Sequence, residues 1–113
     1  MTIDDLKTYG ANTEEGLGRC MNNEGFYLRL VKMIPGDANF QKLYDAVAGG
    51  DLATAFEAAH GLKGSTGNLA LTPLFAPISE ITELLRAKTQ TDYTALIGRI
   101  RESRDELARL CEK

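Results

Sequence analysis

Apolar residues recur at intervals of three and four along most of this 113-residue chain, and no segment alternates apolar and polar residues with a period of two. The first spacing puts apolar side chains on one face of an α-helix, whereas a half-buried strand needs the second. Leu74, Ile78, Ile81 and Leu85 are a clear example of the helical spacing. The pattern therefore predicts an all-α fold.

Residues that favour N-cap positions, together with glycine and proline, indicate where the helices begin and end. Each expected helix has such a start signal: Thr2 for 3–9, Thr13 for 13–21, Asn23 for 24–34, Asp37 for 38–48, Asp51 for 52–70, Thr72 for the helix that carries 74–85, and Thr91 for the last helix. Gly10 and Gly49–Gly50 are expected to end two of them. Pro35 and Gly36 either bend one long helix or separate two, and the sequence leaves both open.

Short connections between long amphipathic helices make neighbouring helices antiparallel. We therefore expect an antiparallel up-and-down four-helix bundle with additional short N-terminal helices. No internal repeat, low-complexity tract or linker divides the chain, so residues 1–113 are expected to form one domain. The charged side chains of the last helix, Arg104 among them, are expected to form its solvated face.

Composition and charge argue against several classes of protein. Apolar residues make up 43% of the chain and charged residues 26%, as in soluble globular proteins. The net charge of −3 argues against nucleic-acid binding, and no Lys/Arg-rich stretch suits a membrane surface. No apolar run approaches the ~20 residues that span a bilayer, and the acidic N-terminus does not resemble a signal peptide. We therefore expect a cytoplasmic protein in which Cys20 and Cys111 are separate, reduced thiols.

The stretch AAHGLKGSTGN, residues 58–68, contains the only histidine of the chain and three glycines, Gly61, Gly64 and Gly67. On a helical wheel with ~100° per residue, the apolar residues of 52–69 form one stripe that must face the core. His60 lies roughly 150° from the centre of that stripe by the same arithmetic. The histidine is therefore expected to point away from the core, with the three glycines beside it on the outward half of the helix.

Each of these glycines costs ~1 kcal/mol relative to alanine inside a helix. Two explanations stay open. Either the helix frays here, so that the glycines cost little, or another molecule approaches the helix closely on its outer face. Ser65, Thr66 and Leu69 keep the helical register beyond the last glycine, which favours close approach.

The residues around His60 limit the chemistry that it can perform. Ser65 lies well round the helix and both cysteines are remote in sequence, so a catalytic triad is not indicated. A metal site needs more imidazole or thiolate ligands than this chain offers. The outer face of a bundle helix rarely forms a pocket for acid–base work on a small molecule. An exposed histidine beside the cation of Lys63 instead suits a nucleophile for a phosphoryl group that a partner protein delivers.

This stretch resembles the core motif of the histidine-containing phosphotransfer (HPt) family of two-component phosphorelays, an acid-capped helix that runs through A-H-x-L-K-G. The matching residues are Gly50-Asp51, Ala55, Ala59-His60-Gly61-Leu62-Lys63-Gly64-Ser65 and Asn68-Leu69, with Glu15-Gly16-Leu17 and Phe26-Tyr27-Leu28 at family-like positions upstream. One residue departs from the pattern, because the family often has a glycine where this chain has Ala70. That position concerns the turn or helix packing, so the departure leaves the phosphoacceptor assignment intact.

The resemblance implies a four-helix bundle in which His60 accepts a phosphoryl group and exchanges it with an aspartate of a receiver domain. It assigns to Lys63 the stabilisation of the phosphoryl charge, and to Gly64 the clearance for the incoming receiver. Gly61 and Gly67 would extend the open surface beyond what the family motif asks for.

Three further residues are candidates for the contact with the receiver. Ala53 and Glu57 are expected to be exposed on the same flank as His60. Phe56, one turn before His60, lies at the edge of the core stripe. Whether Phe56 is a core residue or an apolar contact for the receiver stays open at this point.

The partners that the resemblance implies are a response-regulator receiver domain, a hybrid histidine kinase or both. Magnesium is expected on the receiver, and no cofactor or metal on this chain. The family has no autonomous kinase activity, and the chain has no glycine-rich nucleotide loop. We expect a monomer. The sequence does not identify the donor, the acceptor or the pathway output. It also leaves open whether this is a free-standing protein or an excised domain.

Two other functions stay open beside the phosphorelay intermediate. One is a helical adaptor that binds a receiver or a kinase without accepting phosphate. The other is a small-molecule enzyme that uses His60 as a base, which requires a pocket at that residue.

Overall fold

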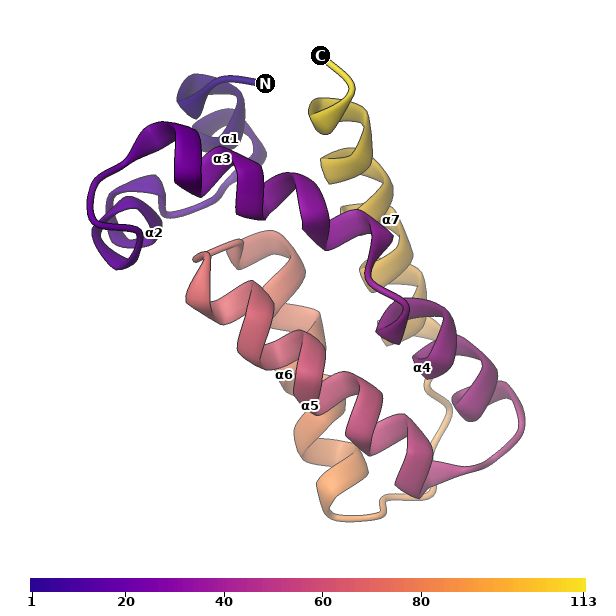
Figure 1. The fold of residues 1–113 in the computed structure, drawn as a ribbon. Helices are drawn as coiled ribbons and strands as arrows, with labels where there is room; N and C mark the ends of the chain where they lie inside the picture. The colour runs from indigo at the N-terminus through magenta and orange to yellow at the C-terminus, as the bar shows by residue number, and fades with distance from the viewer.

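The computed structural model describes all 113 residues, and every regular element in it is a helix (Figure 1). In chain order these are α1 (Ile3–Tyr9), α2 (Thr13–Arg19), α3 (Glu24–Met33), the short 3-10 helix η1 (Ile34–Gly36), α4 (Asn39–Ala48), α5 (Leu52–Asn68), α6 (Thr72–Arg86) and α7 (Thr94–Cys111). The predicted all-α class is therefore confirmed. None of the helices combines the length and the apolar character needed to cross a bilayer.

Helices α4 to α7 form the up-and-down bundle that the sequence predicts. Along the chain each packs against the next, so α5 lies between α4 and α6 and α6 lies against α7 (Figure 1). The interior is filled by fully buried apolar side chains from all four helices: Phe40, Leu43, Leu62, Leu74, Ile78, Ile81, Ile100 and Leu107. Each such side chain contributes roughly 1.5–3 kcal/mol by leaving water, which makes this core the main source of the fold's stability.

Two arginines of α7 lie over aromatic rings of α4. The guanidinium carbon of Arg101 lies 4.1 Å from the ring centroid of Tyr44, and that of Arg104 lies 4.6 Å from the ring of Phe40. Arg104 also donates a hydrogen bond to the carbonyl oxygen of Pro35 at 2.8 Å. The expectation that Arg104 belongs to a solvated face is therefore wrong, because its apolar stem and planar head cover aromatic rings of α4.

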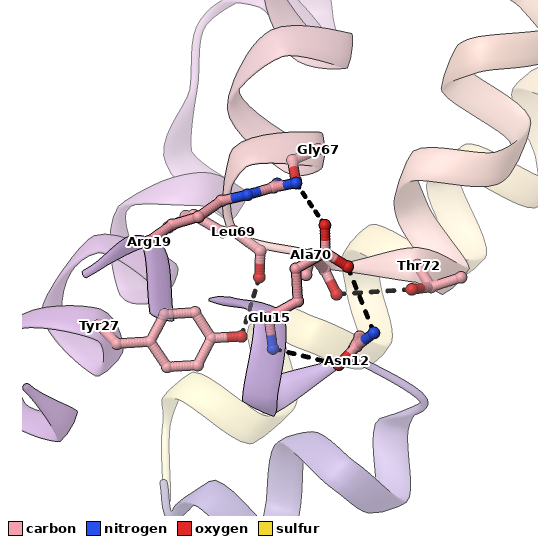
Figure 2. A network of polar contacts seen from close by, with 8 residues as sticks. All are labelled: Asn12, Glu15, Arg19, Tyr27, Gly67, Leu69, Ala70 and Thr72. Atoms are coloured by element: carbon pink, nitrogen blue, oxygen red, sulfur yellow. Dashed lines mark hydrogen bonds and ion pairs between the residues drawn. The ribbon is translucent and has the colours of Figure 1, made fainter. Parts of the chain in front are cut away.

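The N-terminal helices α1 to α3 lie at one end of the bundle (Figure 1). Polar contacts fasten them to the end of α5 (Figure 2). The buried hydroxyl of Tyr27 donates to the carbonyl oxygen of Leu69 at 2.8 Å. The backbone N–H of Asn12 donates to the carbonyl oxygen of Ala70 at 2.9 Å. Gly16 leaves room for the Tyr27 ring, since a Cβ there would lie 2.6 Å from it. Burial, and secondly the nearby Cys20, raise the pKa of Tyr27 to about 12, as expected for a phenol held in the protein interior.

The cap of α2 and the start of α7 differ from the sequence expectation. Asn12 rather than Thr13 caps α2, because its side chain accepts the backbone N–H of Glu15 at 3.2 Å. The last helix begins at Thr94 rather than after Thr91, since Asp92 accepts the N–H of Thr94 and Tyr93 is drawn into the core. Helix α2 still begins at Thr13, so only its cap differs, whereas α7 begins a few residues later than expected and keeps its core-facing stripe.

The region of Pro35 and Gly36 separates two helices. Helix α3 ends at Met33, the 3-10 helix η1 follows, and α4 begins at Asn39. Asp37 lies just before α4, where its carboxylate accepts the backbone N–H of Asn39 at 2.8 Å. The chain is therefore broken rather than smoothly bent between α3 and α4.

Candidate functional site

Helix α5 places the only histidine of the chain on the surface. Asp51 caps the helix by accepting the backbone N–H of Thr54 at 3.1 Å, as the sequence predicts. Most of the predicted stripe is buried: Ala55, Ala58, Ala59, Leu62, Thr66 and Leu69, with Leu52 half-buried. His60 is exposed, midway along the helix. His60 therefore points away from the core, as its position on the helical wheel predicts.

The His60 ring rests on Phe56, one turn earlier on α5. The two ring centroids are 5.5 Å apart and the planes are inclined by 28°, which is a stacked arrangement. Phe56 is half-buried and packs against the core, and the guanidinium carbon of Arg86 on α6 lies 4.9 Å from its ring centroid. Phe56 therefore has one side in the protein and one side under the histidine.

Lys63 is engaged with α6. Its Nζ lies 3.0 Å from Oε1 of Glu83, and Oε2 of the same carboxylate accepts the Nε–H of Arg86 at 3.2 Å. The hydrogen bond from Lys63, and secondly that from Arg86, hold the pKa of the Glu83 carboxyl below its ordinary value. The side chain of Lys63 is 30% exposed. The cation next to His60 is thus already paired with an anion of this chain.

The three glycines of α5 have different surroundings. A Cβ added at Gly64 would meet nothing within 4 Å, so this glycine is open to solvent as predicted. A Cβ at Gly61 would lie 3.0 Å from Nδ2 of Asn39 on α4, and one at Gly67 would lie 3.0 Å from the ring of Phe75 on α6. Gly61 and Gly67 are expected from the sequence to extend the open surface around His60 for another molecule. This expectation is wrong, because side chains of the same chain, Asn39 and Phe75, already lie beside them.

The predicted contact residues lie along a groove between the start of α5 and the end of α6. This groove has a volume of about 620 Å³, and Ala53, Phe56 and Glu57 line it together with Arg86. Glu57 is also within 3.8 Å of Lys42 on α4. A second hollow, near the end of α5, is lined by Gly64 and Gly67 and by residues of α2 and α6.

His60 lines none of the hollows in the surface. Along α5 it stands between the groove at the start of the helix and the hollow near its end. A base that works on a small molecule needs walls that enclose the substrate. The geometry therefore disfavours the small-molecule enzyme and favours a histidine reached by another macromolecule.

Glu83 and Arg86 are the residues of this site that sequence reasoning missed. Their spacing of three on one helix indicates a pair with each other. Nothing in the sequence indicates that the pair faces Lys63, which lies 20 residues earlier than Glu83. That proximity depends on how α6 packs against α5.

No group of three or more histidine, cysteine, aspartate or glutamate side chains is placed to hold a metal ion. A family model described as Hpt domain matches residues 36–112. The match spans α4 to α7 and includes the whole A-H-x-L-K-G motif, while α1 to α3 lie before it. Comparisons with curated proteins and with solved structures gave no match.

Proposed function

The chain belongs to the Hpt domain family, and on that premise we propose that His60 is its phosphoacceptor. Hpt domains have a phosphotransfer role in two-component signalling and are phosphocarriers rather than autonomous enzymes. The observation that carries the assignment to this residue is the exposed position of His60 midway along α5, inside the family motif.

The chemistry asks little of this chain beyond an accessible imidazole. A ring nitrogen with a free lone pair attacks phosphorus, the N–P bond forms, and the bond from phosphorus to the aspartate oxygen of the donor breaks. The aspartate leaves as a carboxylate, and the reverse reaction returns the phosphoryl group. The stack on Phe56 supports this role because it limits the orientations of the ring before the partner arrives.

The proposed partner is the receiver domain of a response regulator or of a hybrid kinase, which would also carry the magnesium. Gly64, one turn after His60 and with nothing near its missing side chain, would let the partner's backbone approach. The groove lined by Ala53, Phe56 and Glu57 would accept apolar side chains of the receiver beside the reacting groups. Lys63 would stabilise the charge of the phosphoryl group.

The test is transfer of label from a receiver. The protein is incubated with a panel of receiver domains, each phosphorylated on its aspartate with radiolabelled acetyl phosphate. We expect label that is stable in alkali and labile in acid, as phosphohistidine is, and we expect none on His60→Gln.

Two results would count against the assignment. Equal labelling of wild type and His60→Gln would place the phosphoryl group elsewhere. Binding of receivers to the wild type without any labelling would identify the chain as an adaptor. The variant is a fair control because His60 is exposed and its replacement leaves the core intact.

A further inference from the structure

The carboxylate of Glu83 joins two side chains that both lead to His60. One is Lys63, three residues after the histidine on α5, whose Nζ is 3.0 Å from Oε1. The other is Arg86, whose Nε is 3.2 Å from Oε2 and whose guanidinium covers the ring of Phe56 on which His60 stacks. A single anion on α6 therefore restrains both the cation three residues after His60 and the aromatic ring on which the imidazole stacks.

These contacts matter because the phosphoryl group brings a second anion to the same place. Phosphate oxygens are strong acceptors for an ammonium, and a lysine has a flexible stem that lets its head move between acceptors. The Lys63–Glu83 pair is partly exposed, with 30% and 54% of the two side chains accessible, so it is weak enough to exchange. Lys63 thus has two competing partners once His60 is phosphorylated.

We propose that Glu83 is a positioning residue of the phosphotransfer site: it holds Lys63 beside His60 before phosphorylation and competes with the phosphoryl group for that ammonium afterwards. This inference rests on the proposed function of His60. The competition keeps the phosphohistidine less stable than Lys63 alone would make it. An intermediate that must pass its phosphoryl group on benefits from such a limit.

The first measurement concerns the protein before phosphorylation. Carboxyl resonances followed by NMR through a pH titration are expected to place the pKa of Glu83 below its ordinary value, and Lys63→Met is expected to raise it. Because the folded-state pKa of Glu83 is lowered, the ion pair is fully present at pH values above the ordinary pKa of a glutamate. It is lost as the pH falls through the lowered pKa. A Glu83 pKa that does not respond to Lys63→Met overturns the inference and leaves the role of His60 untouched.

The second measurement is the lifetime of the phosphohistidine. The protein is phosphorylated with phosphoramidate, a small donor that releases ammonia as its phosphoryl group moves to the imidazole, so no partner is needed. Glu83→Gln is expected to lengthen the lifetime by about two- to fivefold, the range that an exposed ion pair can supply. Glu80→Gln is the matched control, because it removes the same charge one turn earlier on α6, where the partner is Arg99 at 3.2 Å.

A double variant separates competition from simple repulsion. In a Lys63→Met background, Glu83→Gln is expected to have no effect on the lifetime of the phosphohistidine, because there is no longer an ammonium that the loss of Glu83 could release. An unchanged or shortened lifetime in Glu83→Gln, or a lengthening that persists without Lys63, overturns the inference alone. Failure of His60 to take up phosphoryl from phosphoramidate and from every receiver overturns the proposed function and this inference with it.

Discussion

Ala70 stands at the end of α5 in a left-handed backbone conformation, with φ at 55°. Its N–H donates to the carbonyl oxygen of Gly67 and the next N–H, of Leu71, donates to that of Thr66. This is the closure in which the residue just past a helix is usually glycine, because a Cβ disfavours positive φ. The departure from the family pattern at Ala70 therefore has a physical meaning, and we expect it to cost stability.

Replacing this residue by glycine should relieve the strain. We expect Ala70→Gly to raise the free energy of unfolding by about 1 kcal/mol. The left-handed form costs an alanine roughly 1–2 kcal/mol. Part of that gain is offset because glycine increases the conformational entropy of the unfolded chain. Denaturant unfolding measures the difference. The control is Ala76→Gly at an exposed position within α6, which should lower stability by about 1 kcal/mol. Destabilisation by both replacements would show that the conformation at Ala70 is not strained.

At the scale of the element, α5 carries its glycines for two different reasons. Gly61 and Gly67 lie where α4 and α6 approach, at Asn39 and Phe75. Gly64 has open space beside it and is exposed. Only Gly64 therefore remains as an argument for the approach of another protein.

The role of Gly64 can be tested without changing the chemistry of the histidine. We expect Gly64→Gln to stabilise the protein by about 0.5 kcal/mol through helix propensity, while slowing phosphoryl uptake from a receiver by about tenfold or more. Uptake from phosphoramidate, which needs no docking, should stay as in the wild type.

Gly98 provides the control for this substitution. It lies exposed in α7, and a Cβ there would also meet nothing within 4 Å. Gly98→Gln should therefore give a similar gain in stability and leave transfer from the receiver unchanged. Normal transfer by Gly64→Gln would contradict the close approach of the receiver.

At the scale of the whole molecule, the N-terminal helices are tied to the bundle at several points. Arg19 of α2 donates to the carbonyl oxygen of Gly67 and forms an ion pair with Glu15 (Figure 2). Tyr9 of α1 donates to the carbonyl oxygen of Ser103 on α7 at 3.0 Å. The amino terminus donates to the carbonyl oxygen of Lys113 at 2.8 Å, so the two chain ends lie together (Figure 1). We therefore expect α1 to α3 to unfold together with the bundle, although the family match begins only at residue 36.

The Tyr27 hydroxyl offers the sharpest test of this coupling. Tyr27→Phe leaves the buried carbonyl oxygen of Leu69 without its donor, which should cost about 1–3 kcal/mol. Amide hydrogen exchange is expected to show the same loss of protection in α3 and in α5. Tyr93→Phe is the control, because its hydroxyl donates only to Thr89 within the loop before α7. Loss of protection confined to α1–α3 would mean that these helices form a separate unit.

The alkaline side of the stability profile follows from the same residue. Burial raises the folded-state pKa of Tyr27 to about 12. The contribution of the protonated hydroxyl to stability is therefore fully present at pH values below the ordinary tyrosine pKa of 10.0, and it is lost as the pH rises through the raised pKa. Absorbance of the tyrosinate is expected to report a group that ionises only near that pH, and Tyr27→Phe should remove it.

Most of the fold could be predicted from the sequence because it depends on local interactions. Helical spacing, the Asp51 cap and the glycines after α4 act between residues within about four positions of one another, and they indicate the helices, the bundle and the core-facing stripe of α5. The outward direction of His60 follows from that stripe. The errors concern the cap of α2 and the start of α7, where neighbouring side chains compete to cap the same helix.

The surroundings of His60 were decided only by the tertiary structure. Glu83 reaches Lys63, Arg86 covers Phe56, and Asn39 fills the space beside Gly61, in each case from a helix distant in sequence. Such pairs depend on the rotation and register with which α4 and α6 pack on α5. The volumes of the side chains across the whole core determine this rotation and register. The sequence therefore determined that a histidine would stand exposed on a helix, and the packing of its neighbours decided which charges and rings surround it.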